Sequence, residues 1–298
     1  MIDRLDKLKS DQARFIADIE AKYAQEAVRL QKRLMTYLNE DLMSRLDISN
    51  GQILNNQYNY NVIYDFETLW DEYSRGYFTP TIRNIANDAL KVTSLSNPYF
   101  KELGLTGSNA VKLFNAATKN VELMMGIERA DGVMRFIKGG YMDRLLQGAE
   151  VKDSVMSILA DSVSVKTDFK ELLTTMRGAV EGSAEVDGAM QRYFRGYVYD
   201  TFTGVQAAYD NYVSEAAGMD YFVYAGTEIK STREFCRDHL NQVYHRDDIA
   251  EFEAQDWGGK NPDVPFVISR GGYNCRHSLR WIPDELVETF GGVLDKTK

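Results

Sequence analysis

Apolar residues recur at alternating spacings of three and four through the first fifty residues. Only Gln12 interrupts the stripe, which comprises Leu5, Leu8, Phe15, Ile19, Tyr23, Ala27, Leu30, Leu34, Leu38, Leu42 and Leu46. This spacing places one apolar face on an α-helix. Residues 1–50 contain neither Gly nor Pro, and Ser49-Asn50-Gly51 offers residues that tolerate the left-handed geometry of a helix end. The pattern therefore predicts one long helix over residues 1–50.

The apolar face of this helix must be covered by something along its length. One interpretation is a partner chain that packs against the helix, with Leu30, Leu34 and Leu38 as candidate partner-binding residues. The other interpretation is an ordinary long helix that folds back onto helices of the same chain. The stripe alone leaves both interpretations open.

Helical spacing returns repeatedly from residue 51 to about residue 220. We predict a helix over 52–74, a third from Thr79-Pro80 to about 91, a short one opening at Ser96-Asn97-Pro98, and further helices over 108–219. No proline occurs in residues 99–261, which permits long helices there. We therefore predict a helical body over residues 51–220.

The pattern changes at Tyr221. The run Tyr221-Phe222-Val223-Tyr224 predicts a short strand, and 279–282 is again strand-like. A short helix is predicted over 232–240. A second is predicted to begin at Asp247-Asp248 and to end at about residue 255. The fold expected for the whole chain is α+β: a mainly α-helical N-terminal body with long helices and a small α+β C-terminal module over residues 221–298.

Charge and hydropathy exclude several classes of partner. The formal net charge is −9 at pH 7, which disfavours binding to nucleic acid and to anionic membranes. We expect no sequence-specific contact with nucleic acid, and no duplex binding tighter than the ~10⁻⁴–10⁻⁶ M of non-specific contacts. No run of ~18 apolar residues predicts a membrane span. The start Met1-Ile2-Asp3-Arg4 is unlike a signal peptide, so synthesis in the cytosol is expected.

Both cysteines and all three histidines lie within residues 236–277. Cys236-x-x-His239 and Cys275-x-His277 supply four groups that suit a tetrahedral zinc ion, and a small, loop-rich module gains most from such a structural metal. Two alternatives stay open: the cysteines could be small core residues, or they could form a disulfide in an oxidising environment. His245 is expected to be a helix-cap or surface residue.

Several blocks in the C-terminal third occur in a recognisable order. They are Tyr224-Ala225-Gly226, Ser231-Thr232-Arg233-Glu234-Phe235-Cys236, Val243-Tyr244, Asp248-Ile249, Gly271-Gly272-Tyr273-Asn274-Cys275-Arg276-His277 and Trp281-Ile282-Pro283. This order resembles the C-terminal domain of the phage Mu F-like head morphogenesis proteins, which are minor head proteins of tailed phages. The resemblance covers about 190–285. One departure is Thr227-Glu228-Ile229-Lys230, where the family commonly has an acidic residue soon after the first strand.

The resemblance implies a virion component in the capsid interior or at the portal vertex. It implies contact with portal or capsid proteins, in several copies per particle, and a role in head assembly, DNA packaging or delivery. The residues singled out as the structural motif are Cys236, His239, Gly271, Gly272, Asn274, Cys275 and His277. No enzymatic activity is expected of the chain.

Two other function classes remain as alternatives. A nuclease- or toxin-like enzyme could use Cys236 as a nucleophile with a histidine base. Phosphate could then be bound by arginines drawn from Arg233, Arg237, Arg270, Arg276 and Arg280. A coiled-coil adaptor of host origin is the second alternative. No glycine pair fits a phosphate-binding loop, so nucleotide binding is not expected.

Overall fold

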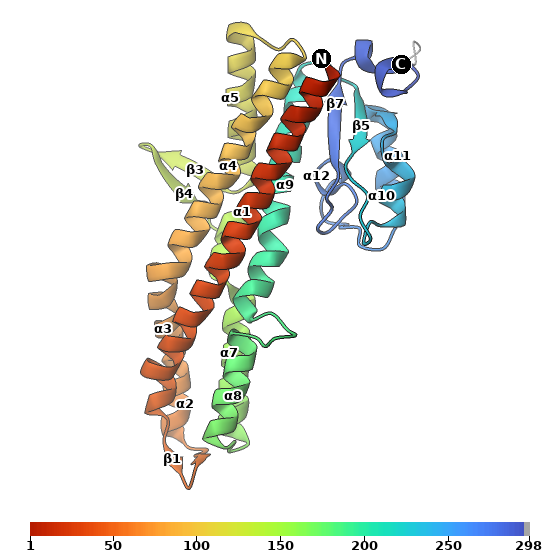
Figure 1. The fold of residues 1–298 in the computed structure, drawn as a ribbon. Coiled ribbons are helices and arrows are strands. Elements are labelled where there is room, and N and C mark those ends of the chain that lie inside the picture. Colours follow the sequence, from red (N-terminus) through yellow and green to blue (C-terminus); the bar gives the residue numbers. More distant parts are fainter. Residues whose placement is uncertain (295–298) are drawn as a thin grey trace. The chain divides into compact units, whose positions relative to one another are not determined.

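A computed structural model describes residues 1–294 of the chain (Figure 1). The chain is 66% helical, with long helices and a few small antiparallel sheets, of which the three-stranded one lies near the C-terminus. The predicted class, mainly helical α+β, is confirmed. Among residues 1–294, no helix combines the length and the apolar character needed to cross a membrane.

Most of the chain is assigned to helices and short strands. The helices are α1 (Ile2–Tyr37), α2 (Gln57–Tyr64), α3 (Phe66–Tyr73), α4 (Thr79–Glu102), α5 (Gly107–Met124), α6 (Tyr141–Gln147), α7 (Ala149–Ser164), α8 (Phe169–Val180), α9 (Ala189–Ala216), α10 (Glu234–His239), α11 (Ile249–Ala254) and α12 (Phe266–Ser269). The strands are β1 (Ile48–Ser49), β2 (Gln52–Ile53), β3 (Ile127–Ala130), β4 (Val133–Phe136), β5 (Tyr221–Ala225), β6 (Val243–His245) and β7 (Ser278–Ile282).

Residues that contact one another fall into two compact units that are interleaved in sequence. Unit 1 contains Met1–Ala17, Asp88–Glu128 and the chain from Tyr199 onward, and unit 2 contains Asp18–Asn87 and Arg129–Val198. These units are groups of contacts rather than single segments. The segment boundaries predicted at residues 50 and 220 therefore stay predictions.

The long N-terminal helix forms close to its predicted extent. α1 ends at Tyr37, and a π-helical turn over Leu38–Leu42 and a 3₁₀ turn over Met43–Arg45 continue the helical path. Asn50 and Gly51 then adopt φ values of 51° and 81°, the left-handed geometry that their residue types predicted.

The partner-binding role predicted for Leu30, Leu34 and Leu38 is contradicted. Each of these side chains is only 1% exposed, in the core of unit 2. The Tyr73 hydroxyl donates a hydrogen bond to the carbonyl of Leu30, at 2.9 Å. Side chains of the same chain cover this part of the apolar face, because burying leucine against leucine and aromatic rings is itself favourable. The other interpretation, a helix packed on its own bundle, holds for these residues.

The break in the apolar stripe has a partner inside unit 1. Gln12 is 2% exposed, and its amide donates to the Ser96 hydroxyl of α4 at 2.7 Å. The same Gln12 accepts a hydrogen bond from the amide of Gln206 on α9, at 2.8 Å. A buried amide is tolerated because these bonds satisfy it.

One local prediction in the helical body is wrong, and one element was missed. No separate helix opens at Ser96-Asn97-Pro98, because α4 runs through it with Pro98 inside. The neighbouring Tyr99 and Phe100 are buried, so their packing outweighs the hydrogen bond that a proline removes. The hairpin of β3 and β4 was not predicted. Its signal was Asp131-Gly132, whose φ values of 53° and 76° are those of a tight hairpin turn.

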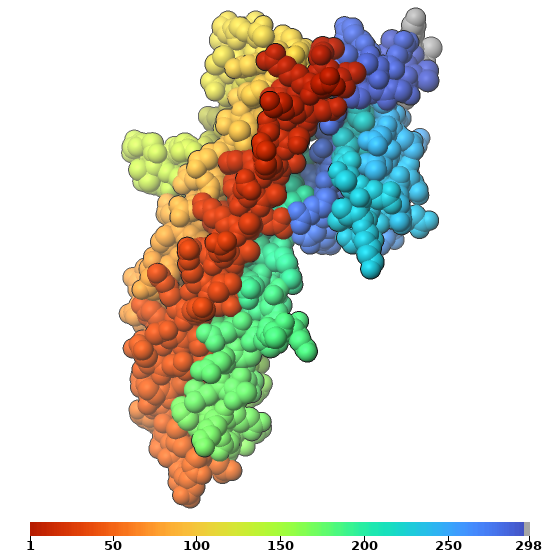
Figure 2. Space-filling model, in the orientation of Figure 1, coloured from red at the N-terminus to blue at the C-terminus, as the bar shows by residue number. Residues whose placement is uncertain are grey.

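The C-terminal module is built on a three-stranded antiparallel sheet in the order β6-β5-β7. Phe222 and Tyr224 of β5 belong to a buried aromatic cluster with Trp281 of β7, as alternate residues on one face of a strand should. The helices α10, α11 and α12 add Phe235, Cys236, Phe252 and Phe266 to this cluster. The strands predicted at 221 and 279 are confirmed, while α12 was missed. Figure 2 shows the module, in cyan to blue, as a compact surface.

Candidate metal centre

Three of the four predicted metal ligands come together inside unit 1. Ligand atoms of Cys236, Cys275 and His277 all lie within 4.8 Å of one another. These three residues are 1%, 2% and 5% exposed, so the cluster is closed to solvent. The Cys275 Sγ lies 3.6 Å from the His277 Nδ1. This group could hold a metal ion.

Local backbone geometry brings the two cysteines to one point. Cys236 lies in α10 and turns inward beside Phe235. Cys275 follows a tight turn in which its N–H donates to the carbonyl of Gly272, at 3.1 Å. Asn274 occupies the left-handed region with a φ of 54°, which asparagine accepts more readily than most residues, and its N–H donates to the carboxylate of Asp200 at 3.0 Å.

The two glycines of the motif are required by close approach. A Cβ on Gly271 would overlap the Cys236 Sγ and would lie 3.0 Å from the Cys275 Sγ. A Cβ on Gly272 would overlap the carbonyl oxygen of Gly259, and Gly272 has a φ of 96° that other residues rarely adopt. The sequence predicted a sharp turn here. The structure adds that the turn lies directly against both sulfur atoms.

The electrostatic surroundings favour a thiolate at Cys275. Hydrogen bonds from Cys236 and from His277, together with the positive charge of Arg270, hold the pKa of Cys275 well below its ordinary value. The Gly271 N–H also donates to the Cys275 Sγ, at 3.3 Å. The pKa of Cys236 is raised by its hydrogen bond to Cys275 and by burial. Metals bind thiolates, so these surroundings favour the form of Cys275 that binds a metal.

The two ring nitrogens of His277 have different surroundings. Its Nε2 is buried and has no hydrogen-bond partner among residues 1–294. An unpaired buried polar atom costs about 1–3 kcal/mol. The nitrogen that faces the sulfurs is the other one, Nδ1, which lies 3.6 Å from the Cys275 Sγ, so Nδ1 is the nitrogen of this ring that could bind a metal beside the two cysteines.

The fourth predicted ligand, His239, does not join the cluster. Its Nδ1 lies 2.6 Å from the hydroxyl of Tyr244, and its ring packs against Phe235 with centroids 4.5 Å apart. α10 ends at His239, so this side chain leaves the helix toward β6 and not toward Cys275. The Cys-x-x-His spacing was therefore misleading as a ligand pair. His245 does cap a 3₁₀ turn, as predicted. Its ring accepts a hydrogen bond from the Asp247 N–H, and the Asp248 carboxylate accepts one from the His245 N–H.

The five arginines proposed for phosphate binding each have a partner of their own. Arg270 donates to the carbonyl and the hydroxyl of Thr203, and it is only 3% exposed. The remaining four pair as follows: Arg233 with the carbonyl of Tyr273, Arg237 with Glu228, Arg276 with the ring of Tyr199, and Arg280 with Asp6. These contacts give the arginines structural roles within unit 1.

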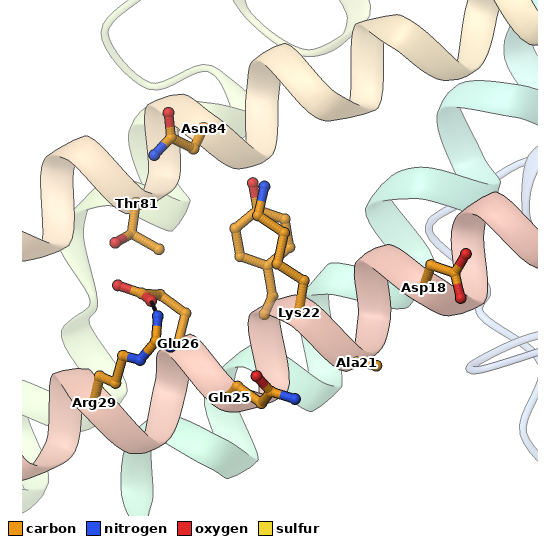
Figure 3. Close-up of a pocket in the computed structure, with 9 residues that line it drawn as sticks. Asp18, Ala21, Lys22, Gln25, Glu26, Arg29, Thr81 and Asn84 are labelled. Carbon is orange, nitrogen blue, oxygen red and sulfur yellow. Dashed lines mark hydrogen bonds and ion pairs between the residues drawn. The ribbon is translucent and has the colours of Figure 1, made fainter.

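A separate surface groove lies in unit 2, between α1 and α4 (Figure 3). It has a volume of about 470 Å³, and the Glu26–Arg29 ion pair, at 3.0 Å, lies on its wall. The other lining residues are Asp18, Ala21, Lys22, Tyr23, Gln25, Thr81 and Asn84. None of the predicted site residues lines this groove, so it is distinct from the Cys/His cluster.

Comparison with known proteins gives no independent identification. No protein-family model, no curated protein and no solved structure matches the chain.

Proposed function

We propose that the chain is a minor capsid protein of tailed-phage head morphogenesis. It would lie in the capsid interior or at the portal vertex, in several copies, and bind portal or capsid proteins during head assembly, DNA packaging or delivery. One observation carries the proposal. The two motif blocks that resemble the Mu F-like family, far apart in sequence, place Cys236, Cys275 and His277 within 4.8 Å of one another. The blocks thus behave as one structural unit, as a family-defining motif should.

The enzyme alternative has weaker support. A catalytic cysteine has to reach substrate and has to form a thiolate readily. Cys236 is 1% exposed and its pKa is raised, and Cys275, whose pKa is lowered, is 2% exposed. Burial of both sulfur atoms favours a structural role for the cluster over a nucleophilic one.

We further propose that the ion held by the cluster is a structural zinc ion. Two cysteine sulfurs and one imidazole are typical zinc ligands, and closed sites are typical of structural rather than catalytic zinc. Within residues 221–294, the module has three strands of at most five residues and helices of at most six. So little regular structure gains much from a metal that ties α10 to the turn before β7.

The capsid proposal predicts that the chain enters particles. The chain would be produced together with the portal and shell proteins of the same phage, and assembled heads would be isolated by sedimentation. We expect the chain to sediment with the heads at a fixed ratio to the portal protein. Heads that form normally while all of the chain stays in the unsedimented fraction would contradict the proposal.

The zinc proposal predicts a defined pattern among three variants. Cys236→Ser and His277→Gln each remove a ligand, so both should lose the metal. Their unfolding free energy should fall by ~4 kcal/mol or more. His239→Gln is the matched control, since His239 contacts Tyr244 and not the sulfurs, and it should keep its zinc. Elemental analysis and thermal unfolding measure both effects. Equal zinc content in His277→Gln and in the unchanged chain would refute the assignment.

A further inference from the structure

Three protein ligands leave a tetrahedral zinc ion one ligand short. Structural zinc sites are almost always four-coordinate, with every position filled by the protein. His239 is engaged elsewhere, so the fourth ligand has to come from another residue at the cluster. The side chain must also reach both cysteine sulfurs from a buried position.

We infer that the hydroxyl of Tyr224 is the fourth ligand of this ion. The inference rests on the zinc centre proposed above. Tyr224 lies in β5 and is completely buried. Its Oη lies 3.3 Å from the Cys236 Sγ and 3.8 Å from the Cys275 Sγ.

These separations match the edges of a zinc tetrahedron. With Zn–S bonds of ~2.3 Å and Zn–O or Zn–N bonds of ~2.0–2.1 Å, tetrahedral angles place a sulfur and an oxygen or nitrogen ligand ~3.5 Å apart. Two sulfurs and two N or O donors make four such edges, and three of them are 3.3 Å and 3.8 Å from the Tyr224 Oη, and 3.6 Å from the His277 Nδ1 to the Cys275 Sγ. All three lie close to the expected length.

A glycine lets the backbone approach three of these donors closely. A Cβ added to Gly271 would lie 3.1 Å from the Tyr224 Oη and 3.0 Å from the Cys275 Sγ, and would overlap the Cys236 Sγ. Only a residue without a Cβ lets the backbone lie this close to the three donor atoms without displacing them.

The Tyr224 side chain is fixed in this orientation. β5 is the central strand, and Tyr224 is paired with Leu279 of β7 while its N–H donates to the carbonyl of Gln242, at 3.0 Å. Its ring stacks on His277 and on Phe266, with interplanar angles of 22° and 18°. The hydroxyl is thus held toward the sulfurs before any ion arrives, which lowers the entropy cost of binding.

The role as a ligand differs from a hydrogen-bonding role by one proton. As a ligand, the Tyr224 oxygen bonds to zinc and its phenol proton passes to the solvent, as do the thiol protons that the cysteines still carry. As a hydrogen-bond donor to Cys236, the phenol would keep its proton. Zinc binding should accordingly release about one proton more if Tyr224 is a ligand.

The test is a zinc titration of the full chain after removal of metal with a chelator. Calorimetry in two buffers of different ionisation enthalpy counts the protons released, and ultraviolet difference spectra detect tyrosinate. The unchanged chain should show a tyrosinate band on binding zinc. Tyr224→Phe should lack that band and release about one proton fewer. Its zinc affinity should fall by more than ~10–100-fold, which is the loss expected when only a hydrogen-bond partner of a ligand is removed.

Tyr244→Phe is the matched control, because its hydroxyl bonds to His239 and Gln242 away from the sulfurs. It should behave like the unchanged chain. Zinc binding by the unchanged chain without a tyrosinate band, and with the same proton count in Tyr224→Phe, would overturn the ligand role and leave the zinc centre intact. Failure of the unchanged chain to bind zinc would overturn both. The presence or absence of the band in the unchanged chain tests the ligand role even if Tyr224→Phe folds poorly.

Discussion

Replacing Leu30 and Leu34 together by glutamate is expected to unfold unit 2. Both side chains are 1% exposed, so each carboxylate would be buried without a partner. Each such burial costs several kcal/mol, about 3–5 kcal/mol when a buried charge lacks its partner. Two of them approach the ~5–15 kcal/mol of total stability of a typical domain. Circular dichroism should show a large loss of helix, and hydrogen exchange should show lost protection within Asp18–Asn87 and Arg129–Val198.

A variant with the same change in charge separates burial from electrostatics. Gln25→Glu with Thr36→Glu adds two carboxylates to exposed positions of α1. Its unfolding free energy should lie within ~1 kcal/mol of that of the unchanged chain, as is usual for surface substitutions. The double variant could instead keep its full helix content and no longer enter particles. That result would restore the interpretation that a partner chain binds the apolar face of the N-terminal helix.

Replacing Gly272 by alanine is expected to destabilise the C-terminal module severely. The new Cβ would overlap the carbonyl oxygen of Gly259, and alanine would be forced into a φ of 96°. Backbone strain of this kind costs ~1–3 kcal/mol, and forced overlap in a packed site costs a further ~1–3 kcal/mol. The hydrogen bond from Tyr273 N–H to that same carbonyl, at 3.0 Å, would also be disturbed. We expect a loss of ~2–6 kcal/mol of unfolding free energy and weakened zinc binding.

Gly258 provides the control for this prediction. It neighbours Gly259, a Cβ on it would meet nothing within 4 Å, and its φ is not positive. Gly258→Ala should therefore change stability by less than ~1 kcal/mol. Equal stability of Gly258→Ala and Gly272→Ala in chemical unfolding would show that the turn is not constrained as the structure indicates.

Periodic patterns predicted the elements whose packing follows the pattern directly. The stripe from Leu5 to Leu46 predicted the N-terminal helix because apolar residues spaced by three and four lie on one face of an α-helix. The run at Tyr221 predicted β5 because aromatic and β-branched residues fit a buried, pleated surface. The Cys/His window was found in a different way, from the clustering of both cysteines and all three histidines between residues 236 and 277.

The remaining features depend on contacts between distant residues, which spacing cannot reveal. Whether Leu30 and Leu34 face a partner or the chain's own helices is a matter of tertiary packing. Cys-x-x-His suggested His239 as a ligand, but Tyr244 of a later strand holds that ring. Tyr224 was interpreted only as a strand residue, because nothing in its neighbourhood in sequence indicates two sulfurs within 4 Å of its hydroxyl.

Native mass spectrometry of the full chain, purified without added metal and without chelator, tests most directly whether Cys236, Cys275 and His277 form one metal centre. The predicted result is the mass of the chain plus one zinc ion, with the zinc lost in His277→Gln and kept in His239→Gln. A chain that carries no metal, with Cys236 and Cys275 either as free thiols or joined in a disulfide, would contradict it.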